Sequence, residues 1–403
     1  MDHINSCDEL HALIDSKTNE TNTLCLEFSD LSFNFFLQLE WLDFIIRKNA
    51  KDKMPELSDE ELSMDNLIKV TFTSCTFTEF DCSNISDQNL IEVNIIGGTI
   101  NEFTCINSRF IRKFYINKQY SNNNEKIKIN KLLISNTIFQ NNFKLHNANV
   151  KIFSIEDTDF EKHADFFKSS FIQGTLPKSK IGFIAINFRG LAIFGDTCFH
   201  KKLVFQYVTF ESHSHFRKAN LNHGLDLDYS NIQNEMNFFD VQNLNSKVAK
   251  NNTSQETDRI IKHNFLKLGN KIEANKYLTL ELEQKKNNLK TKPKEWLDFL
   301  VFFIHWHSSK FGTRWFRVLL LILSTSLVTI GFIHFPLLKE ILQDPCQFKT
   351  EYFRKILDEI FQYVYLLNKT STLEAYPKVL IFNKVCLGYL YYQFLVSIRK
   401  NTK

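Results

Sequence analysis

The sequence predicts a mainly β repeat domain, flanked by helices and followed by helices long enough to cross a membrane. Three observations lead to this fold class. Large apolar residues recur every five positions within 70–245, residues 318–335 carry no charged side chain, and a second apolar stretch covers 379–398. A period of five is neither the helical period of 3.6 nor the strand period of 2. The first stretch is therefore an internal repeat with a five-residue unit.

Composition limits the classes of protein to consider. The 403 residues leave room for two or three domains, and the net charge of +4 is too balanced for a typical nucleic-acid binder. The eight cysteines form no Cys-x-x-Cys pair, which favours buried thiols in a reducing compartment. The first ten residues lack the basic and apolar regions of a signal peptide, so we expect the N-terminal part to stay in the cytoplasm.

Residues 1–69 are expected to form a helical N-terminal cap. Leu31 to Ile46 is a dense apolar stretch that ends at a charged run. Ser58 and Glu61 form a capping-box pattern, which predicts a short helix from Ser58 to Ile68.

The period-five pattern continues through several runs between Val70 and Leu244. The clearest are Leu90, Ile95, Ile100, Cys105, Phe110, Tyr115; Leu145, Val150, Ile155, Phe160; Phe166, Phe171, Leu176, Ile181, Ile186, Leu191; and, with steps of five and six that recur every 11 residues, Phe194, Phe199, Phe205, Phe210, Phe216, Leu221, Leu227, Ile232. A small residue often stands two positions earlier, as in Ala148-Asn-Val150 and Ala219-Asn-Leu221. These two positions point to the same side of a strand, so both are expected to face the interior.

Such triplets resemble the Ala-(Asp/Asn)-(Leu/Phe) core of pentapeptide-repeat proteins. The resemblance implies a right-handed parallel β-helix over 70–245, with four five-residue faces in each coil. Strictly repeated coils would place Phe171 over Leu191 and Phe166 over Ile186, at a strand spacing of about 4.8 Å. Residues 117–130 look like an insertion, and the six-residue steps depart from strict four-faced coils. A β-sandwich is the alternative, although it requires a period-2 alternation that is not sustained here.

Residues 253–292 are predicted to form one long amphipathic helix. Thr253 and Glu256 make a capping box. A 4-3-4-3 apolar seam follows at Ile261, Phe265, Leu268, Ile272, Asn275, Thr279 and Leu282. We expect this face to cover the open edge of the last coil, with a short coiled coil as the alternative.

Two transmembrane helices are predicted, over 315–335 and 379–398. Eighteen uncharged residues at 1.5 Å each reach across a hydrocarbon core of about 30 Å. The second helix is weaker, because Asn383 and Lys384 are costly in lipid unless the lysine reaches the interface or a partner helix. Residues 296–307 are too few to cross and are expected to form a helix in the membrane interface.

The distribution of basic residues predicts the orientation. Many precede the first helix and three follow the second, whereas the loop between them has six basic and six acidic residues. Both termini and the tail 399–403 are therefore expected in the cytoplasm and loop 336–378 outside. Together with the resemblance, this predicts a multi-pass protein of the bacterial inner (plasma) membrane. Anionic lipid headgroups are expected near Lys285, Lys286, Lys290, Lys292 and Lys294.

Candidate chemistry is sparse. Asp226 and Asp228 share one face of a predicted strand, at a spacing used for acid/base work in some carbohydrate-active β-helices, although a solvated strand face is the expected reading. His200, His213, His215 and His223, and the pair His305 and His307, are read as surface or interfacial histidines rather than metal ligands. No phosphate-binding loop or nucleophile elbow is found. We therefore predict no catalytic, cofactor-binding or metal-binding residues.

The predicted function is that of a membrane-anchored scaffold or interaction protein without catalytic activity. Its expected partners are membrane lipid and an unidentified cytoplasmic protein, without nucleic acid, and assembly into homo-oligomers is left open. The alternative is a channel-like membrane protein or sensor, because the helical hairpin looks like a degenerate form of the two-span pore module fused to some pentapeptide-repeat proteins. Residues 332–387 contain no glycine, so a potassium-type filter is lacking.

Overall fold

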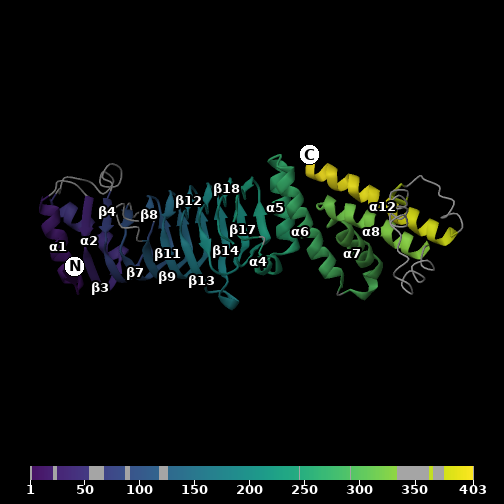
Figure 1. Ribbon diagram of the computed structural model, residues 1–403. Helices are drawn as coiled ribbons and strands as arrows, with labels where there is room; N and C mark the ends of the chain where they lie inside the picture. Colours follow the sequence, from purple (N-terminus) through teal and green to yellow (C-terminus); the bar gives the residue numbers. More distant parts are fainter. Residues whose placement is uncertain are drawn as a thin grey trace, which may run out of the picture. The chain divides into compact units, whose positions relative to one another are not determined.

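The computed structural model describes residues 2–20, 25–53, 68–86, 91–117, 126–244, 246–290, 292–333, 363–365 and 376–402. The chain divides into two compact units, Met1–Lys267 and Leu268–Lys403. The first unit contains two large parallel sheets, and helices occur in both units (Figure 1). The described chain is thus a mixed α/β arrangement. The predicted flanking helices and apolar C-terminal helices are present, but a mainly β class is not confirmed.

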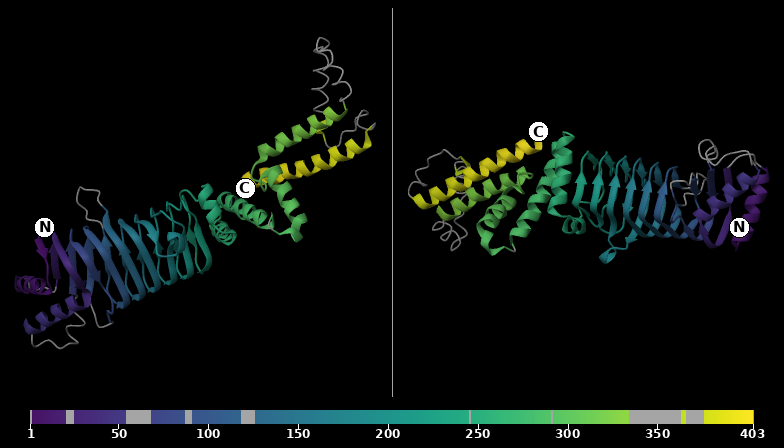
Figure 2. Two further views of the ribbon diagram at one scale, coloured as in Figure 1. Left: turned by 90° about the horizontal axis from the view of Figure 1, so that it is seen from below. Right: turned by 180° about the vertical axis from the view of Figure 1, so that it is seen from behind.

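Successive strands of the first unit alternate between the two sheets. Among the described residues, the 11-stranded sheet contains β1 (Asp2–Ile4), β3 (Leu31–Gln38), β5 (Thr76–Asp81), β7 (Thr99–Phe110), β9 (Ile127–Phe139), β11 (Ala148–Phe160), β13 (Ser170–Gly174), β14 (Ile181–Phe188), β16 (Cys198–Phe199), β17 (Leu203–Phe210) and β19 (Leu225–Ile232). The 9-stranded sheet contains β2 (Cys25–Ser29), β4 (Ile68–Thr73), β6 (Ile91–Ile96), β8 (Phe114–Asn117), β10 (Phe143–Leu145), β12 (Ala164–Asp165), β15 (Ala192–Ile193), β18 (Ser214–His215) and β20 (Met236–Asn237). Figure 2 shows these strands side by side along the unit.

One passage of the chain through both sheets is called a circuit here. Leu203 pairs with Leu225, 22 residues later, whereas Ile155 pairs with Phe183, 28 residues later. The longer circuit includes an extra turn, η1 (Pro177–Ser179). The predicted stacking of Phe171 over Leu191 is therefore wrong, because the added residues shift the register and Phe171 pairs with Phe199. Phe166 likewise stacks on Phe194 rather than on Ile186, with ring centroids 5.1 Å apart.

The period-five residues fill the interior between the sheets. Most of the predicted large residues and the small residues of the triplets, such as Ala148 and Ala219, are fully buried. Their rings form columns with centroids about one strand spacing apart, and one column runs through Phe110, Phe139, Phe160, Phe188 and Phe210. Leu176, in the extra turn, and Tyr115 and Leu191 are only half-buried. Among the predicted buried thiols, Cys75, Cys82 and Cys105 are buried and Cys7 is exposed.

Left-handed residues form the corners of the circuits. One column contains Asn84, Asn107, Asn136, Asp157, Ala185 and Tyr207, and a second contains Asn147, Lys168, Asp196, Lys218 and Asp240, all with positive φ. Asn and Asp tolerate this conformation better than other residues with a side chain. In the first column the side-chain amide of Asn136 also donates to Oδ1 of Asn107 at 2.8 Å. The chain thus turns repeatedly with few glycines.

The N-terminal region differs from the predicted helical cap. Helices α1 (Cys7–Glu20) and α2 (Leu39–Lys53) are present, but Leu31–Gln38 is strand β3 rather than helix. Phe28 and Phe33 stack on Phe72 and Phe77, so 25–38 supplies another circuit of the same sheets. Burial of these rings outweighs local helix propensity. The short helix predicted at Ser58 lies outside the described residues, apart from Ile68, which begins β4.

The predicted long helix over 253–292 is two helices. They are α5 (Gln255–Lys267) and α6 (Lys271–Lys290), separated by Gly269 with a φ of +73°. A left-handed glycine ends a helix, so the predicted 4-3-4-3 seam is broken there. A short helix, α4 (Lys247–Asn252), precedes α5.

Three further helices belong to the second unit with α6. They are α7 (Trp296–Ser309), preceded by the turn η2 (Pro293–Glu295), α8 (Trp315–Ile333) and α12 (Pro377–Thr402). Helix α12 is longer than predicted at both ends, so 377–378 and 399–402 are helical rather than loop and tail. Most of the predicted loop 336–378 lies outside the described residues.

Candidate functional site: an apolar helical surface and a groove beside the last strand

Helices α8 and α12 pack against each other. Val318 and Ile322 of α8 contact Leu387 and Leu390 of α12 in a buried apolar cluster. A polar contact lies farther along the same pair, where the side-chain amide of Asn383 donates to Oγ1 of Thr329 at 2.9 Å. Both residues are buried, so Nδ2 of Asn383 finds its partner on the neighbouring helix, whereas the buried Oδ1 of Asn383 has no hydrogen-bond partner among the described residues.

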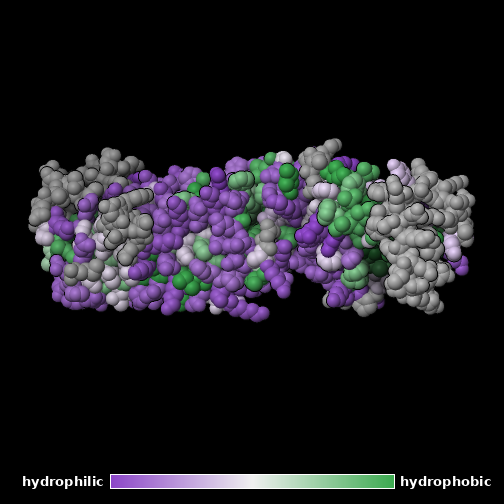
Figure 3. Space-filling model, in the orientation of Figure 1, coloured by the Kyte–Doolittle hydropathy of each residue, from purple (hydrophilic) through white to green (hydrophobic). Residues whose placement is uncertain are grey.

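Much of the remaining surface of these helices is apolar and exposed. Helix α8 and residues Pro377–Lys400 of α12 are long and apolar enough to cross a membrane, with only 33% and 22% of their apolar windows buried. The exposed side chains are Trp315, Phe316, Leu320, Leu323, Leu327, Val328 and Phe332 on α8, and Ile381, Phe382, Val385, Tyr392, Leu395 and Ile398 on α12. Figure 3 shows apolar residues over the region of α7 and α8. A buried helix of a soluble core would instead have most of its apolar side chains covered.

Helix α7 continues this apolar surface. Trp296, Leu297, Leu300, Val301 and Ile304 are exposed, and Val301 is 63% accessible. The helix has the bounds predicted for the interfacial segment to within two residues. Exposed aromatic and aliphatic side chains on a short helix are typical of a segment that lies in a membrane interface.

Basic side chains gather at the aromatic residues of α7. Nζ of Lys286 lies 3.7 Å from the ring centroid of Trp306, and Cζ of Arg317 lies 5.8 Å from the same centroid. Nζ of Lys285 lies 5.1 Å from the ring of Phe302. We call these five residues the Trp306 cluster. The basic residues of the cluster were recognised in the sequence because they precede the first apolar helix. No sequence pattern indicated that Trp306 would contact both Lys286 of α6 and Arg317 of α8.

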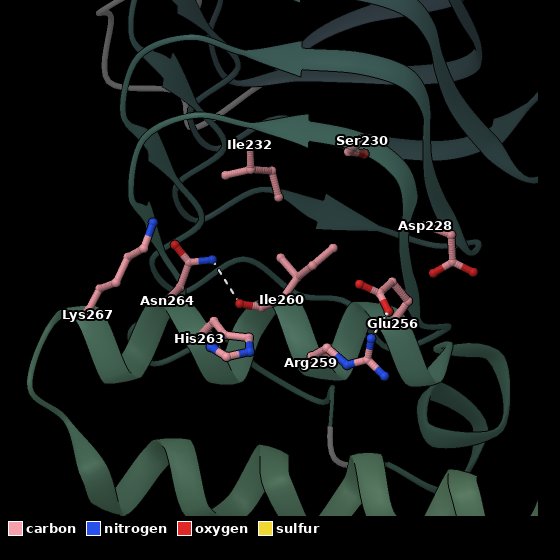
Figure 4. Close-up of a pocket in the computed structure, with 9 residues that line it drawn as sticks. All are labelled: Asp228, Ser230, Ile232, Glu256, Arg259, Ile260, His263, Asn264 and Lys267. Atoms are coloured by element: carbon pink, nitrogen blue, oxygen red, sulfur yellow. Dashed lines mark hydrogen bonds and ion pairs between the residues drawn. The ribbon is translucent and has the colours of Figure 1, made fainter.

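A groove of about 290 Å³ lies between β19 and α5 in the first unit (Figure 4). Asp228 and Glu256 lie near one end and Lys267 at the other. Glu256 forms an ion pair with Arg259, with 2.8 Å between Oε2 and Nη1. Asn264 donates to the carbonyl of Ile260 at the bottom of the groove. Its acidic side chains are therefore already engaged by neighbouring groups.

The two carboxylates singled out in the sequence belong to this region. Oδ2 of Asp226 pairs with Nζ of Lys202 at 2.6 Å. Asp228 accepts hydrogen bonds from the hydroxyls of Ser254 and Thr257, at the start of α5. Asp226 thus ties the last strand to the preceding circuit, and Asp228 ties it to the covering helix α5, which is a structural use of the pair.

The histidines singled out in the sequence are dispersed. Nε2 of His200 lies 3.1 Å from Oγ of Ser170, whereas His215 lies in β18, where burial lowers its pKa. His305 and His307 pack against Phe311 and Phe303 of their own unit. Within the described part of the chain, no three His, Cys, Asp or Glu side chains are arranged to hold a metal ion.

Comparisons of this chain with protein-family models, curated proteins and solved structures find no match.

Proposed function

We propose that this chain is a scaffold or interaction protein without catalytic activity, anchored in the bacterial inner membrane by α8 and α12. In this proposal the two parallel sheets form a right-handed β-helix of the pentapeptide-repeat kind that presents its faces to a cytoplasmic protein. Three features support such a β-helix: strands that alternate between two parallel sheets, columns of stacked phenylalanines, and columns of left-handed corners.

The observation that carries the anchoring is the exposed apolar surface of α8 and α12. In water this surface would cost free energy in proportion to its area, whereas in hydrocarbon the cost disappears. Helix α7 would lie in the interface on the cytoplasmic side, since Lys285, Lys286 and Arg317 lie beside it. Both chain ends would then be cytoplasmic.

Membrane extraction tests this anchoring. Full-length protein in isolated membranes is washed with alkaline carbonate, which removes peripheral but not integral proteins. We expect the chain to stay with the membrane, and Leu327→Arg to weaken integration because the arginine would enter the hydrocarbon core. Tyr207→Arg, at an exposed apolar position of the first unit, is the matched control and should integrate normally. Release of the unsubstituted chain would contradict the proposal.

A surface for the cytoplasmic partner is offered by two neighbouring strands. Tyr207 on β17 and Tyr229 on β19 are 63% and 67% exposed, with ring centroids 5.8 Å apart. Exposed tyrosines are enriched at protein interfaces. A photocrosslinker at residue 207 should capture one defined protein in cells, and the same group at Lys151, on the surface of β11, should not.

One observation favours the second candidate, a channel-like protein or sensor. Helices α8 and α12 carry buried polar side chains, Ser326 and Thr329 on α8 and Asn383 and Gln393 on α12, and Asn383 contacts Thr329 across the pair. In an assembly of several copies such residues would line a polar path. An ion current through vesicles that contain the purified chain, abolished by Asn383→Leu, would favour this function over the scaffold.

A further inference from the structure

The Trp306 cluster concentrates positive charge where three helices of the second unit meet. Lys286 comes from α6, Trp306 from α7 and Arg317 from the first turn of α8. Nζ of Lys286 lies 3.7 Å, and Cζ of Arg317 5.8 Å, from the centroid of the Trp306 ring. The two cationic groups therefore lie within 10 Å of each other, about one Debye length at 0.1 M salt. Like charges repel each other, and the indole ring attracts both cations without neutralising the charge of either.

One carboxylate, that of Glu283, contacts the cluster but pairs with neither of the two cations. Its Oε1 accepts Nζ of Lys310 and Nε1 of Trp306, each at 3.2 Å. Among the described residues, neither Lys286 nor Arg317 forms an ion pair with a carboxylate. Burial lowers the pKa of Lys286; the charge of Glu283 opposes this as the next largest effect, and the charges of Lys290 and Lys310 add to the lowering. The ammonium group is therefore partly dehydrated, although Glu283 supplies some negative charge.

The surroundings of the cluster fit a lipid rather than a soluble anion. Phe316 and Leu320, beside Arg317 on α8, are 55% and 51% exposed. Arg317 stands at the start of the apolar helix, at the level where headgroup phosphates would lie if α8 crosses a bilayer. A ligand with a phosphate at Arg317 and acyl chains along α8 would satisfy both the charge and the apolar surface.

We propose that Lys286 and Arg317, gathered at Trp306, bind the phosphate of one anionic phospholipid whose acyl chains lie along the exposed face of α8. This inference rests on the proposed membrane anchoring. It goes beyond diffuse attraction of basic residues to a charged membrane, because it assigns one lipid to two named cations.

Lipid binding in neutral detergent tests the site, since micelles of such a detergent have no surface potential. Full-length protein is mixed with dioleoyl phosphatidylglycerol, and retained lipid is counted by native mass spectrometry. We expect one tightly held lipid per chain. The double variant Lys286→Gln/Arg317→Gln should lose about twenty-five-fold in affinity, because each cation contributes about fivefold. The single variant Arg317→Gln should lose about fivefold and serves if the double variant fails to fold.

Three comparisons make the result decisive. The matched control Lys290→Gln/Lys294→Gln removes two charges of the same basic region and should retain the lipid within about twofold. The variant Lys286→Arg/Arg317→Lys keeps both charges and should also bind. Glycerol 3-phosphate, which has the phosphate without acyl chains, should not displace the lipid at equal concentration. Equal losses in the two glutamine double variants, unchanged binding in Arg317→Gln, or displacement by glycerol 3-phosphate would overturn the proposal.

Flotation with vesicles of neutral phosphatidylcholine separates this inference from the proposed function. Integration into such vesicles depends on α8 and α12 and requires no anionic headgroup. A chain that floats with them but shows no preference for phosphatidylglycerol retains its anchor and loses only the lipid site. A chain that does not float loses the anchor.

Discussion

The side-chain hydroxyl of Thr257 accepts a 2.9 Å hydrogen bond from the backbone N–H of Leu227. In the same way, Oδ1 of Asn264 accepts a 2.9 Å hydrogen bond from the backbone N–H of Met236. The hydroxyl of Thr253 accepts one from the N–H of Leu225 at 3.3 Å. These N–H groups belong to β19 and β20, the last strands of the two sheets in the described part of the chain, where no further described strand accepts them. Helix α5, together with Thr253 two residues before it, therefore covers the open edge with side-chain acceptors, as expected from the sequence.

Replacing Thr257 by valine should destabilise the first unit by about 1–3 kcal/mol, because the buried N–H of Leu227 would lose its acceptor while the shape stays nearly the same. Denaturant unfolding of the detergent-solubilised chain, followed by the β signal in circular dichroism, measures the change. Thr78→Val, at an exposed threonine of β5, is the control and should change the free energy of unfolding by less than about 0.5 kcal/mol. Equal effects of the two substitutions would contradict this role of Thr257.

Ala185→Gly should stabilise the same unit by about 1 kcal/mol. Ala185 has a φ of +53°, a conformation that costs an alanine roughly 1–2 kcal/mol and a glycine almost nothing. The control Ala148→Gly, at a buried alanine of β11, should destabilise the unit. The two free energies of unfolding should thus change in opposite directions, and a loss of stability in Ala185→Gly would show that the corner is not strained.

His215 should make stability depend on pH. Burial, followed by the charge of Arg217, lowers its pKa below the ordinary value of 6.5, although Asp196 and Asp165 oppose part of the shift. The unfolded chain therefore binds more protons, and the contribution of this residue is fully present above pH 6.5 and is lost as the pH falls below it. Unfolding free energies measured between pH 5 and pH 7.5, roughly the range in which histidine titrates, should show a slope that decreases in His215→Gln. An unchanged slope in His215→Gln would exclude this residue as the cause of the pH dependence. His213→Gln is the control and should leave the slope unchanged.

The pair Asn383 and Thr329 should be energetically coupled. A double-mutant cycle with Asn383→Leu and Thr329→Val, measured by unfolding in mixed micelles, is expected to give a coupling of about 0.6 kcal/mol and at most about 1.7 kcal/mol, the range found for hydrogen bonds between membrane helices. Strictly additive effects would mean that the contact does not hold α8 against α12.

Part of the fold could be predicted because burial leaves a periodic trace in the sequence. The step of five that places Val150 and Ile155 in the interior also separates Phe28 from Phe33, so the circuit in the N-terminal region had the same signal. The length of a circuit could not be predicted from that step. The extra residues around Pro177 change the residue that pairs with Phe171 from the predicted Leu191 to Phe199. The 11-residue recurrence near the end is half of the observed 22-residue circuit.

The corners and the candidate sites were harder to predict. The scarcity of glycine was compatible with repeated corners, but it did not reveal that Asn136 or Lys168 would adopt a left-handed conformation. Asp228 looked like half of a carboxylate pair, and only the packing of α5 assigns it to Thr257. The Trp306 cluster depends on contacts among three helices, which no local pattern encodes.

Membrane topology tests the central claim most directly. Reporters that are active only in the cytoplasm, or only outside it, are fused at Leu10, Gln347 and Lys403. Two spanning helices, α8 and α12, predict Leu10 and Lys403 inside and Gln347 outside. Lys403 outside would mean that α12 does not complete a second crossing, and all three positions inside would contradict the membrane anchor itself.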